Sequence, residues 1–124
     1  MANSGPGYAK HPEHTVTVAP FHGHVVIEAG GGVIADTKNA LLLKEANYPP
    51  VYYVPRADAK MTDLVRTDHH THCPFKGEAS YFSISGGVEN AVWSYELPFD
   101  EVLAIRDHLA FYPDRVSAIK VEPA

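Results

Sequence analysis

Reactive side chains are most concentrated in residues 67–77, where three of the eight histidines and the only cysteine of the chain occur. Cysteine acts as a nucleophile in its thiolate form, and a nearby imidazole or cation favours that form. If the protein is an enzyme, we expect Cys73 to be the nucleophile or redox thiol and His72 or His69 to be the base. Lys76, three residues after the cysteine, would then hold an anionic part of the substrate.

The same segment admits a metal-binding and a structural interpretation. As a metal site, His70 and His72 would share one face of an extended chain, and Cys73 would add a thiolate, which is a ligand set suited to zinc or copper. As a structural loop, the thiol would be buried and the histidines would hydrogen-bond to the backbone. A further pattern upstream matches the first half of the cupin metal motif, with ligands at His22, His24 and Glu28. Because one cysteine cannot build a closed sulfur-rich zinc site, we expect no bound metal and no cofactor.

Residues suited to contact a small molecule are spread over several segments. Tyrosine and tryptophan combine an apolar ring with a polar group, and Arg56 offers a planar fork for a carboxylate or phosphate as an alternative to Lys76. We expect a pocket around a loop of residues 71–77, lined by Tyr52, Arg56, Thr71, Lys76, Gly77, Tyr81 and Trp93. The protein would then be a small-molecule-binding or enzymatic domain, with a thiol-dependent reaction as one option. The alternative is a non-catalytic interaction module that uses the aromatic surface.

Short strands dominate the elements that must position these residues. Runs rich in β-branched and aromatic residues, bounded by Gly and Pro, predict strands at residues 14–18, 24–28, 51–54 and 116–121. The first two of these strands are expected to pair with each other. Residues 79–85 and 90–96 flank Gly86 and Gly87, and this arrangement predicts a hairpin.

One helix and one long loop complete the predicted elements. Apolar residues at helical spacing behind an acidic start predict a helix over residues 99–111, and the polar run of residues 68–77 predicts a loop. The predicted fold class is mainly β, with antiparallel strands in two sheets or in a tent-like or partly closed barrel, and with one short helix near the C-terminus.

Length and charge limit the classes of protein to which the chain can belong. Its 124 residues fit a single domain, residues 13–124, preceded by a loosely held arm of residues 1–12. The net charge of -5 has the wrong sign for a strong hold on nucleic acid. The sequence has neither a long apolar segment nor a signal peptide, so we expect a cytoplasmic protein without a membrane partner. A homodimer remains open.

Four motifs resemble a known family in their order and spacing: GVIADT at residues 32–37, YPPVYYVPR at 48–56, THCPFKG at 71–77 followed by Ala79 and Tyr81, and AFYPDRV at 110–116. The family is the domain-of-unknown-function family DUF427, which is also labelled nucleotidyltransferase-like, and the resemblance covers about residues 11–122. It implies a small bacterial-type domain of mostly antiparallel sheet, similar to the tent-like folds of methionine sulfoxide reductase B and related zinc-pinned domains. It implies no established activity.

Overall fold

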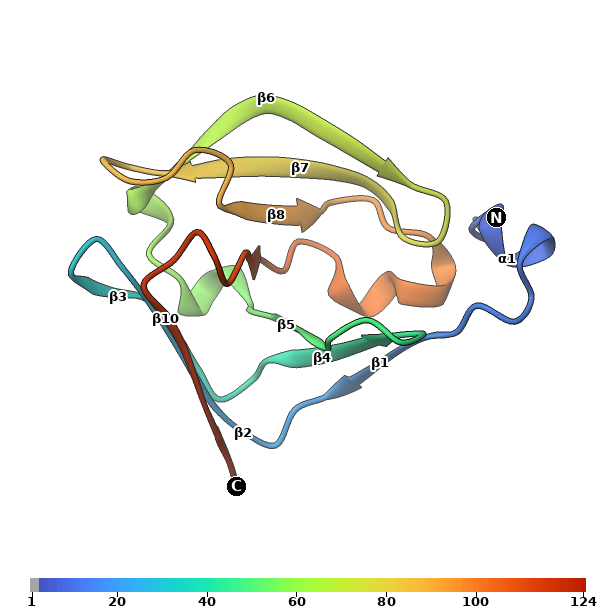
Figure 1. The fold of residues 1–124 in the computed structure, drawn as a ribbon, viewed down its shortest axis with the longest axis horizontal. Helices are drawn as coiled ribbons and strands as arrows, with labels where there is room; N and C mark the ends of the chain where they lie inside the picture. Colours follow the sequence, from blue (N-terminus) through green and yellow to red (C-terminus); the bar gives the residue numbers. More distant parts are fainter. Residues whose placement is uncertain (1–2) are drawn as a thin grey trace.

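Three antiparallel sheets form the framework of the computed structural model, which describes residues 3–124. The first sheet has the order β1-β4-β5, with bounds Val16–Pro20, Leu41–Glu45 and Val51–Tyr53. The second has the order β10-β2-β3, with bounds Ala118–Pro123, Gly23–Ala29 and Gly32–Thr37. The third has the order β6-β7-β8-β9, with bounds Leu64–Cys73, Gly77–Ile84, Val92–Tyr95 and Ala110–Phe111. Figure 1 shows the third sheet at the top, the second at the lower left and the first at the lower right.

Helical structure in the described residues is limited to short segments. They are the α-helix α1 (Gly7–Lys10) and the 3-10 helices η1 (Arg56–Asp58), η2 (Met61–Asp63) and η3 (Asp100–Ile105). Within residues 3–124, no helix has the length and apolar character that crossing a membrane requires. The predicted mainly β fold is confirmed, and the sheets of the described residues do not close into a barrel.

Two clusters of buried side chains form the core, and strand β7 contributes to both. In the first cluster, Phe82 and Ile84 of β7 join Val25 and Ile27 of β2. In the second cluster, Tyr81 of β7 joins side chains of β4, β5, β8 and η3, namely Leu43, Tyr53, Tyr95 and Ile105. Because successive side chains of a strand point to opposite faces, β7 carries core residues on both of its faces.

The predicted pairing of the first two strands is wrong, although both strands exist. β1 pairs with β4, with Val16 opposite Glu45, whereas β2 pairs with β3 and β10 in a different sheet. Pro20 ends β1 and lacks the N–H that a continuing ladder needs, so the chain turns from one sheet into the next. Strand propensity located these two strands, but their partners lie far away in the sequence.

The predicted helix over residues 99–111 is also wrong. The segment forms only the 3-10 helix η3, with a kink at Val102, and then reverses at Asp107, whose φ is 62°. Leu109 exchanges two backbone hydrogen bonds with Val54, at 2.8 and 2.7 Å. Val102, Ile105 and Leu109 are buried, as their helical spacing predicted. Their burial does not need an α-helix, because the backbone pairing of Leu109 with Val54 holds this segment against the core.

Residues 68–77 are not a loop, because most of them belong to strands. β6 extends to Cys73 and β7 begins at Gly77, so only the three residues between them form the turn. The register is irregular between Arg66 and His70, where β6 contains two more residues than β7 opposite it. β6 is an edge strand, and a polar sequence is compatible with its mostly exposed side chains. The predicted hairpin is confirmed as β7 and β8, with Tyr81 opposite Trp93.

Residues 1–2 of the segment expected to be a loosely held arm lie outside the described residues, and its part around Gly7 and Tyr8 lies against the β6–β7 turn. The N–H of Gly7 donates to the carbonyl of Pro74 at 3.0 Å, and the Tyr8 hydroxyl donates to the carbonyl of Phe75 at 3.0 Å. A Cβ atom at Gly7 would lie 2.8 Å from the Phe75 ring, so only glycine allows this close approach.

Candidate functional site

The third sheet divides the predicted site residues between its two faces. We call one side the tyrosine face, which carries Thr71, Cys73, Tyr81, Trp93 and Tyr95. We call the other side the arginine face, which carries Arg66, His72, Ser80, Phe82 and Ser94. The division follows from the cross-strand register, because residues directly opposite each other in antiparallel strands share a face.

Hydroxyl groups form a connected line on the tyrosine face. The Thr71 Oγ1 and the Tyr81 hydroxyl lie 2.9 Å apart, and the Tyr81 hydroxyl lies 3.2 Å from that of Tyr112. The Trp93 ring lies 4.5 Å from the Tyr112 ring, and its Nε1–H donates to the Tyr53 hydroxyl at 3.2 Å. Strands β5, β6, β7 and β8 and the residue after β9 thus bring these five side chains together.

Three tyrosines in and beside this face, Tyr53, Tyr95 and Tyr112, act as neutral hydrogen-bonding groups at physiological pH. Burial, reinforced by the hydrogen bond with Tyr81, raises the pKa of Tyr112 to about 12. Burial also raises the pKa of Tyr53 and of Tyr95 well above the ordinary tyrosine value. A phenol with a raised pKa keeps its proton, so these three tyrosines can donate to and accept from a polar group but do not supply a base.

The structure places His69, but not His72, on the same face as Cys73. The His69 ring contacts the Tyr81 ring at 4.5 Å, whereas the His72 Nδ1 points to Glu78 at 4.0 Å on the other face. Cys73 is partly buried at the end of β6. His69 and Cys73 are four residues apart on β6, which corresponds to about 13 Å at strand spacing. A direct hydrogen bond between the thiol and this imidazole is therefore out of reach.

Lys76 belongs to a largely buried group of charges with Glu45 and His14. The Lys76 Nζ donates to Glu45 Oε1 at 2.7 Å, and His14 Nε2 lies 2.8 Å from Glu45 Oε2. The side chains of Lys76 and Glu45 are only 16% and 13% exposed. Burial alone would raise the pKa of Glu45, but hydrogen bonds from Lys76 and His14 outweigh burial and lower it. The expected anion-binding lysine is thus already paired within the protein.

A cavity of about 240 Å³ lies beside Trp93. Its lining is mostly apolar and comes from all three sheets and the segments beside them, including Ile27, Val51, Tyr52, Trp93, Phe111 and Ile119. Tyr52 and Trp93 are two of the ligand-contacting residues predicted from the sequence, and the Tyr52 ring packs edge-on against Phe21 at 5.0 Å. The residues of the expected loop, including Thr71 and Gly77, do not line this cavity.

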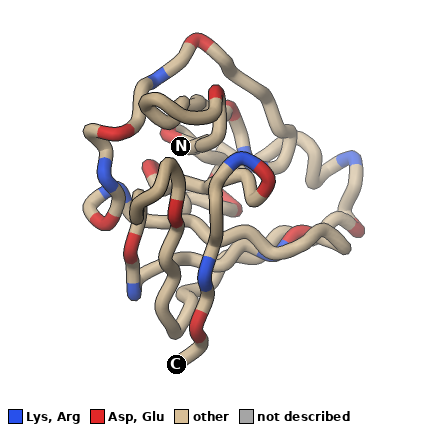
Figure 2. Tube along the Cα trace, turned by 60° about the vertical axis from the view of Figure 1, so that its left-hand side comes forward, with Lys and Arg blue, Asp and Glu red and all other residues tan. Residues whose placement is uncertain are grey.

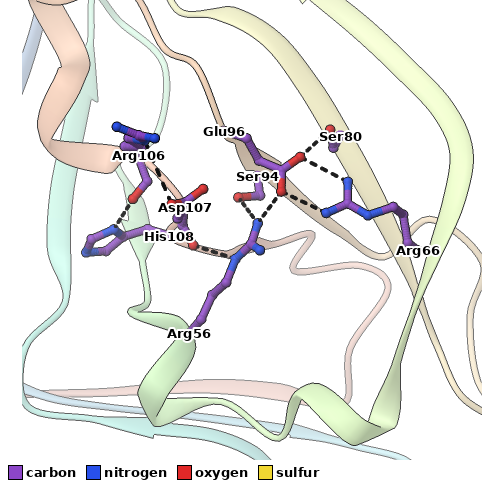
Figure 3. Close-up of polar contacts among 8 residues, drawn as sticks. All are labelled: Arg56, Arg66, Ser80, Ser94, Glu96, Arg106, Asp107 and His108. Atoms are coloured by element: carbon purple, nitrogen blue, oxygen red, sulfur yellow. Dashed lines mark hydrogen bonds and ion pairs between the residues drawn. The ribbon is translucent and has the colours of Figure 1, made fainter.

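Arg56 lies on the arginine face, where its guanidinium group points toward Ser94 and Glu96 (Figure 3). Its Nη2 donates to Ser94 Oγ at 3.0 Å and to Glu96 Oε2 at 3.1 Å. Arg66 binds both oxygens of Glu96, at 3.0 and 2.7 Å. Figure 2 shows acidic and basic residues interspersed along the chain, so this pair of arginines is a local feature of the molecule.

The two metal-binding hypotheses find no assembled ligand set in the part of the chain that the structure describes. Within residues 3–124, no three His, Cys, Asp or Glu side chains are grouped so that they could hold a metal ion. His24 instead lies 2.5 Å from Asp36 Oδ1, and Glu28 accepts from Lys120 at 3.1 Å.

The sequence analysis assigned no role in the site to several of its residues. Glu45, His14 and Tyr112 come from segments far from residues 67–77, and only the fold brings them to Lys76 and Tyr81. Glu96 ends the predicted hairpin, but its two arginine partners are 30 and 40 residues away.

Comparison with known proteins places the chain in a family. No curated protein matches it. A family model described as a domain of unknown function (DUF427) matches residues 17–122, which include every site residue predicted from the sequence. The resemblance inferred from the four motifs is thereby confirmed, and the chain belongs to the DUF427 family.

Proposed function

We propose that the protein binds a small molecule in the cavity beside Trp93, with the apolar body of the ligand between Trp93 and Tyr52. The observation that carries this proposal is the dual position of Trp93, whose ring lines the cavity and also contacts Tyr112 at 4.5 Å. An apolar cavity next to a few ordered polar groups is the usual composition of a ligand site. The ligand would place its ring in the cavity and its polar end near the hydroxyl line.

The size of the cavity supports a ligand of about one ring. Its volume of about 240 Å³ lies just below the range of about 300–1,000 Å³ that is usual for ligand pockets. An interaction module can bind a macromolecule through a flat surface and does not need a cavity. For this reason we favour a small molecule as the ligand. Cys73 lies at the far end of the tyrosine face, so a thiol-dependent reaction would require a longer ligand that extends from Trp93 along β6.

The fluorescence of Trp93 offers a direct test, because it is the only tryptophan of the chain. Phenol and other single-ring fragments should change its emission in a saturable way. Ile119→Phe should fill the cavity and abolish this change. Val65→Phe should leave it intact, because Val65 is 54% exposed and does not line the cavity. A saturable change that persists equally in Ile119→Phe, or no saturable change in the native protein, would contradict the proposal.

A further inference from the structure

Two guanidinium groups on the arginine face share one carboxylate (Figure 3). Glu96 Oε2 accepts from Nη2 of both Arg56 and Arg66, and Glu96 Oε1 accepts from Arg66 and from the Ser80 hydroxyl at 3.1 Å. Hydrogen bonds from Arg66, Arg56 and Ser80 outweigh the effect of burial and lower the pKa of Glu96 to about 2, so the carboxylate stays ionised. Two guanidiniums and one carboxylate leave one positive charge in excess, in a chain whose net charge is -5.

Neither arginine uses all of its donors within the described residues. A guanidinium has five N–H groups. Arg56 donates through Nε to the carbonyl of Asp107 at 2.7 Å and through Nη2 to Ser94 and Glu96, which leaves both N–H groups of Nη1. Arg66 donates one N–H of Nη1 and one N–H of Nη2 to Glu96. The N–H of Nε and the second N–H of both Nη1 and Nη2 are left unused.

Both guanidiniums are held in place. They lie over the Phe82 ring, at 5.5 Å for Arg56 and 4.9 Å for Arg66, and Phe82 itself is only 5% exposed. Ser94, which accepts from Arg56, is fully buried. Cation–π contact and shared hydrogen bonds fix the two side chains before any ligand arrives, so binding costs little side-chain entropy.

The two arginines are nevertheless reachable from solvent, with side chains 28% and 49% exposed. The Asp107 carboxylate lies 3.8 Å from Arg106 Nε, and Glu96 is bound on both oxygens, so the nearby negative charges already have partners. We propose that Arg56 and Arg66 form a binding site for the phosphate group of a small phosphorylated molecule.

Phosphate suits this site better than a carboxylate does. A phosphate monoester offers three acceptor oxygens and up to two negative charges, whereas a carboxylate offers two oxygens and one charge. The two guanidiniums meet at the same oxygen, Glu96 Oε2, and we infer that a group with three oxygens bridges their unused N–H groups. The site lies on the opposite face of the sheet from the hydroxyl line, and the inference does not depend on the proposed function.

Nitrogen-15 NMR of the arginine Nε–H groups tests the proposal, because the chain has only four arginines. The full-length protein is titrated with inorganic phosphate, phosphoserine and acetate at constant ionic strength. We expect saturable shifts of the Arg56 and Arg66 signals with both phosphates, and binding of acetate that is at least about tenfold weaker. The proposal is overturned if neither inorganic phosphate nor phosphoserine gives saturable shifts, or if acetate binds with equal affinity.

Charge variants separate this site from general attraction to cations. Arg66→Gln should weaken phosphate binding by about tenfold or more, while Lys120→Gln, which removes an equal charge at an exposed site, should not change it. The amide spectrum shows whether Arg66→Gln is folded. Arg66→Lys keeps the charge but lacks the fork, and it should also bind more weakly. Unchanged affinity in both Arg66 variants would refute the site.

Discussion

At the scale of single residues, Glu45 shows how a polar side chain joins distant parts of the chain. Its two oxygens bind Lys76 from the β6–β7 turn and His14 from the segment before β1. The His14 ring stacks on Phe75 at 4.0 Å, so the group of charges is covered by an aromatic ring. Loss of this carboxylate would leave the largely buried ammonium of Lys76 without its partner.

We therefore expect Glu45→Gln to destabilise the protein by about 2 kcal/mol at neutral pH. The pKa of Glu45 in the folded protein lies below its usual 4.5, so the folded state releases this proton more readily than the unfolded state. The stabilisation is complete above about pH 4.5 and is lost as the pH falls through the folded-state pKa. The melting temperatures of the native protein and Glu45→Gln should converge in acid. A gap that stays constant down to about pH 3, or an equal effect of Glu122→Gln at an exposed site, would contradict this.

At the scale of elements, Gly77 determines how β6 turns into β7. Its φ is 118°, a region that residues with a side chain rarely adopt, and a Cβ there would lie 3.3 Å from the carbonyl of Leu97. Gly77→Ala should cost about 1–3 kcal/mol, measured by urea unfolding. Gly32→Ala is the matched control, because Gly32 has no positive φ and a Cβ there meets nothing within 4 Å. Equal stabilities of the two variants would show that the backbone at Gly77 is not strained.

The elements also show which parts of the fold and the site the sequence can predict. The β7–β8 hairpin was predictable because its turn is local, and the alternation along it correctly separates Tyr81 from Phe82. The pairing of β1 with β4 was not predictable, because it joins segments more than 20 residues apart in the sequence. The periodicity after Pro98 marks buried residues correctly, but the backbone pairing of Leu109 with Val54 replaces the helix. In the site, Thr71, Tyr81 and Trp93 were predictable, whereas Tyr112 and Glu45 depend on contacts that only the fold creates.

At the scale of the whole molecule, the N-terminal segment closes one end of the structure. Figure 1 shows α1 beside the β6–β7 turn, and Gly5 N–H donates to Glu101 Oε1 at 3.0 Å. Deletion of residues 1–10 should lower the melting temperature by several degrees, roughly 4 °C for each kcal/mol lost, and should speed amide exchange at Lys76 and Gly77. Tyr8→Phe, which removes one hydrogen bond and keeps the ring, should have a much smaller effect. An unchanged melting temperature after the deletion would contradict this role.

The irregular register of β6 has a consequence for behaviour in concentrated solution. β6 is one of the two edge strands of the four-stranded sheet, and a free edge can recruit another chain by backbone pairing. The regular pairing of β6 with β7 is interrupted between Arg66 and His70, so β6 has three paired residues before the interruption and four after it. A strand added at this edge could form only two short ladders, and ladders of this length are marginal in water. The extra residues in β6 therefore act against amyloid-like growth, and the longest strand of the protein remains a poor template for aggregation.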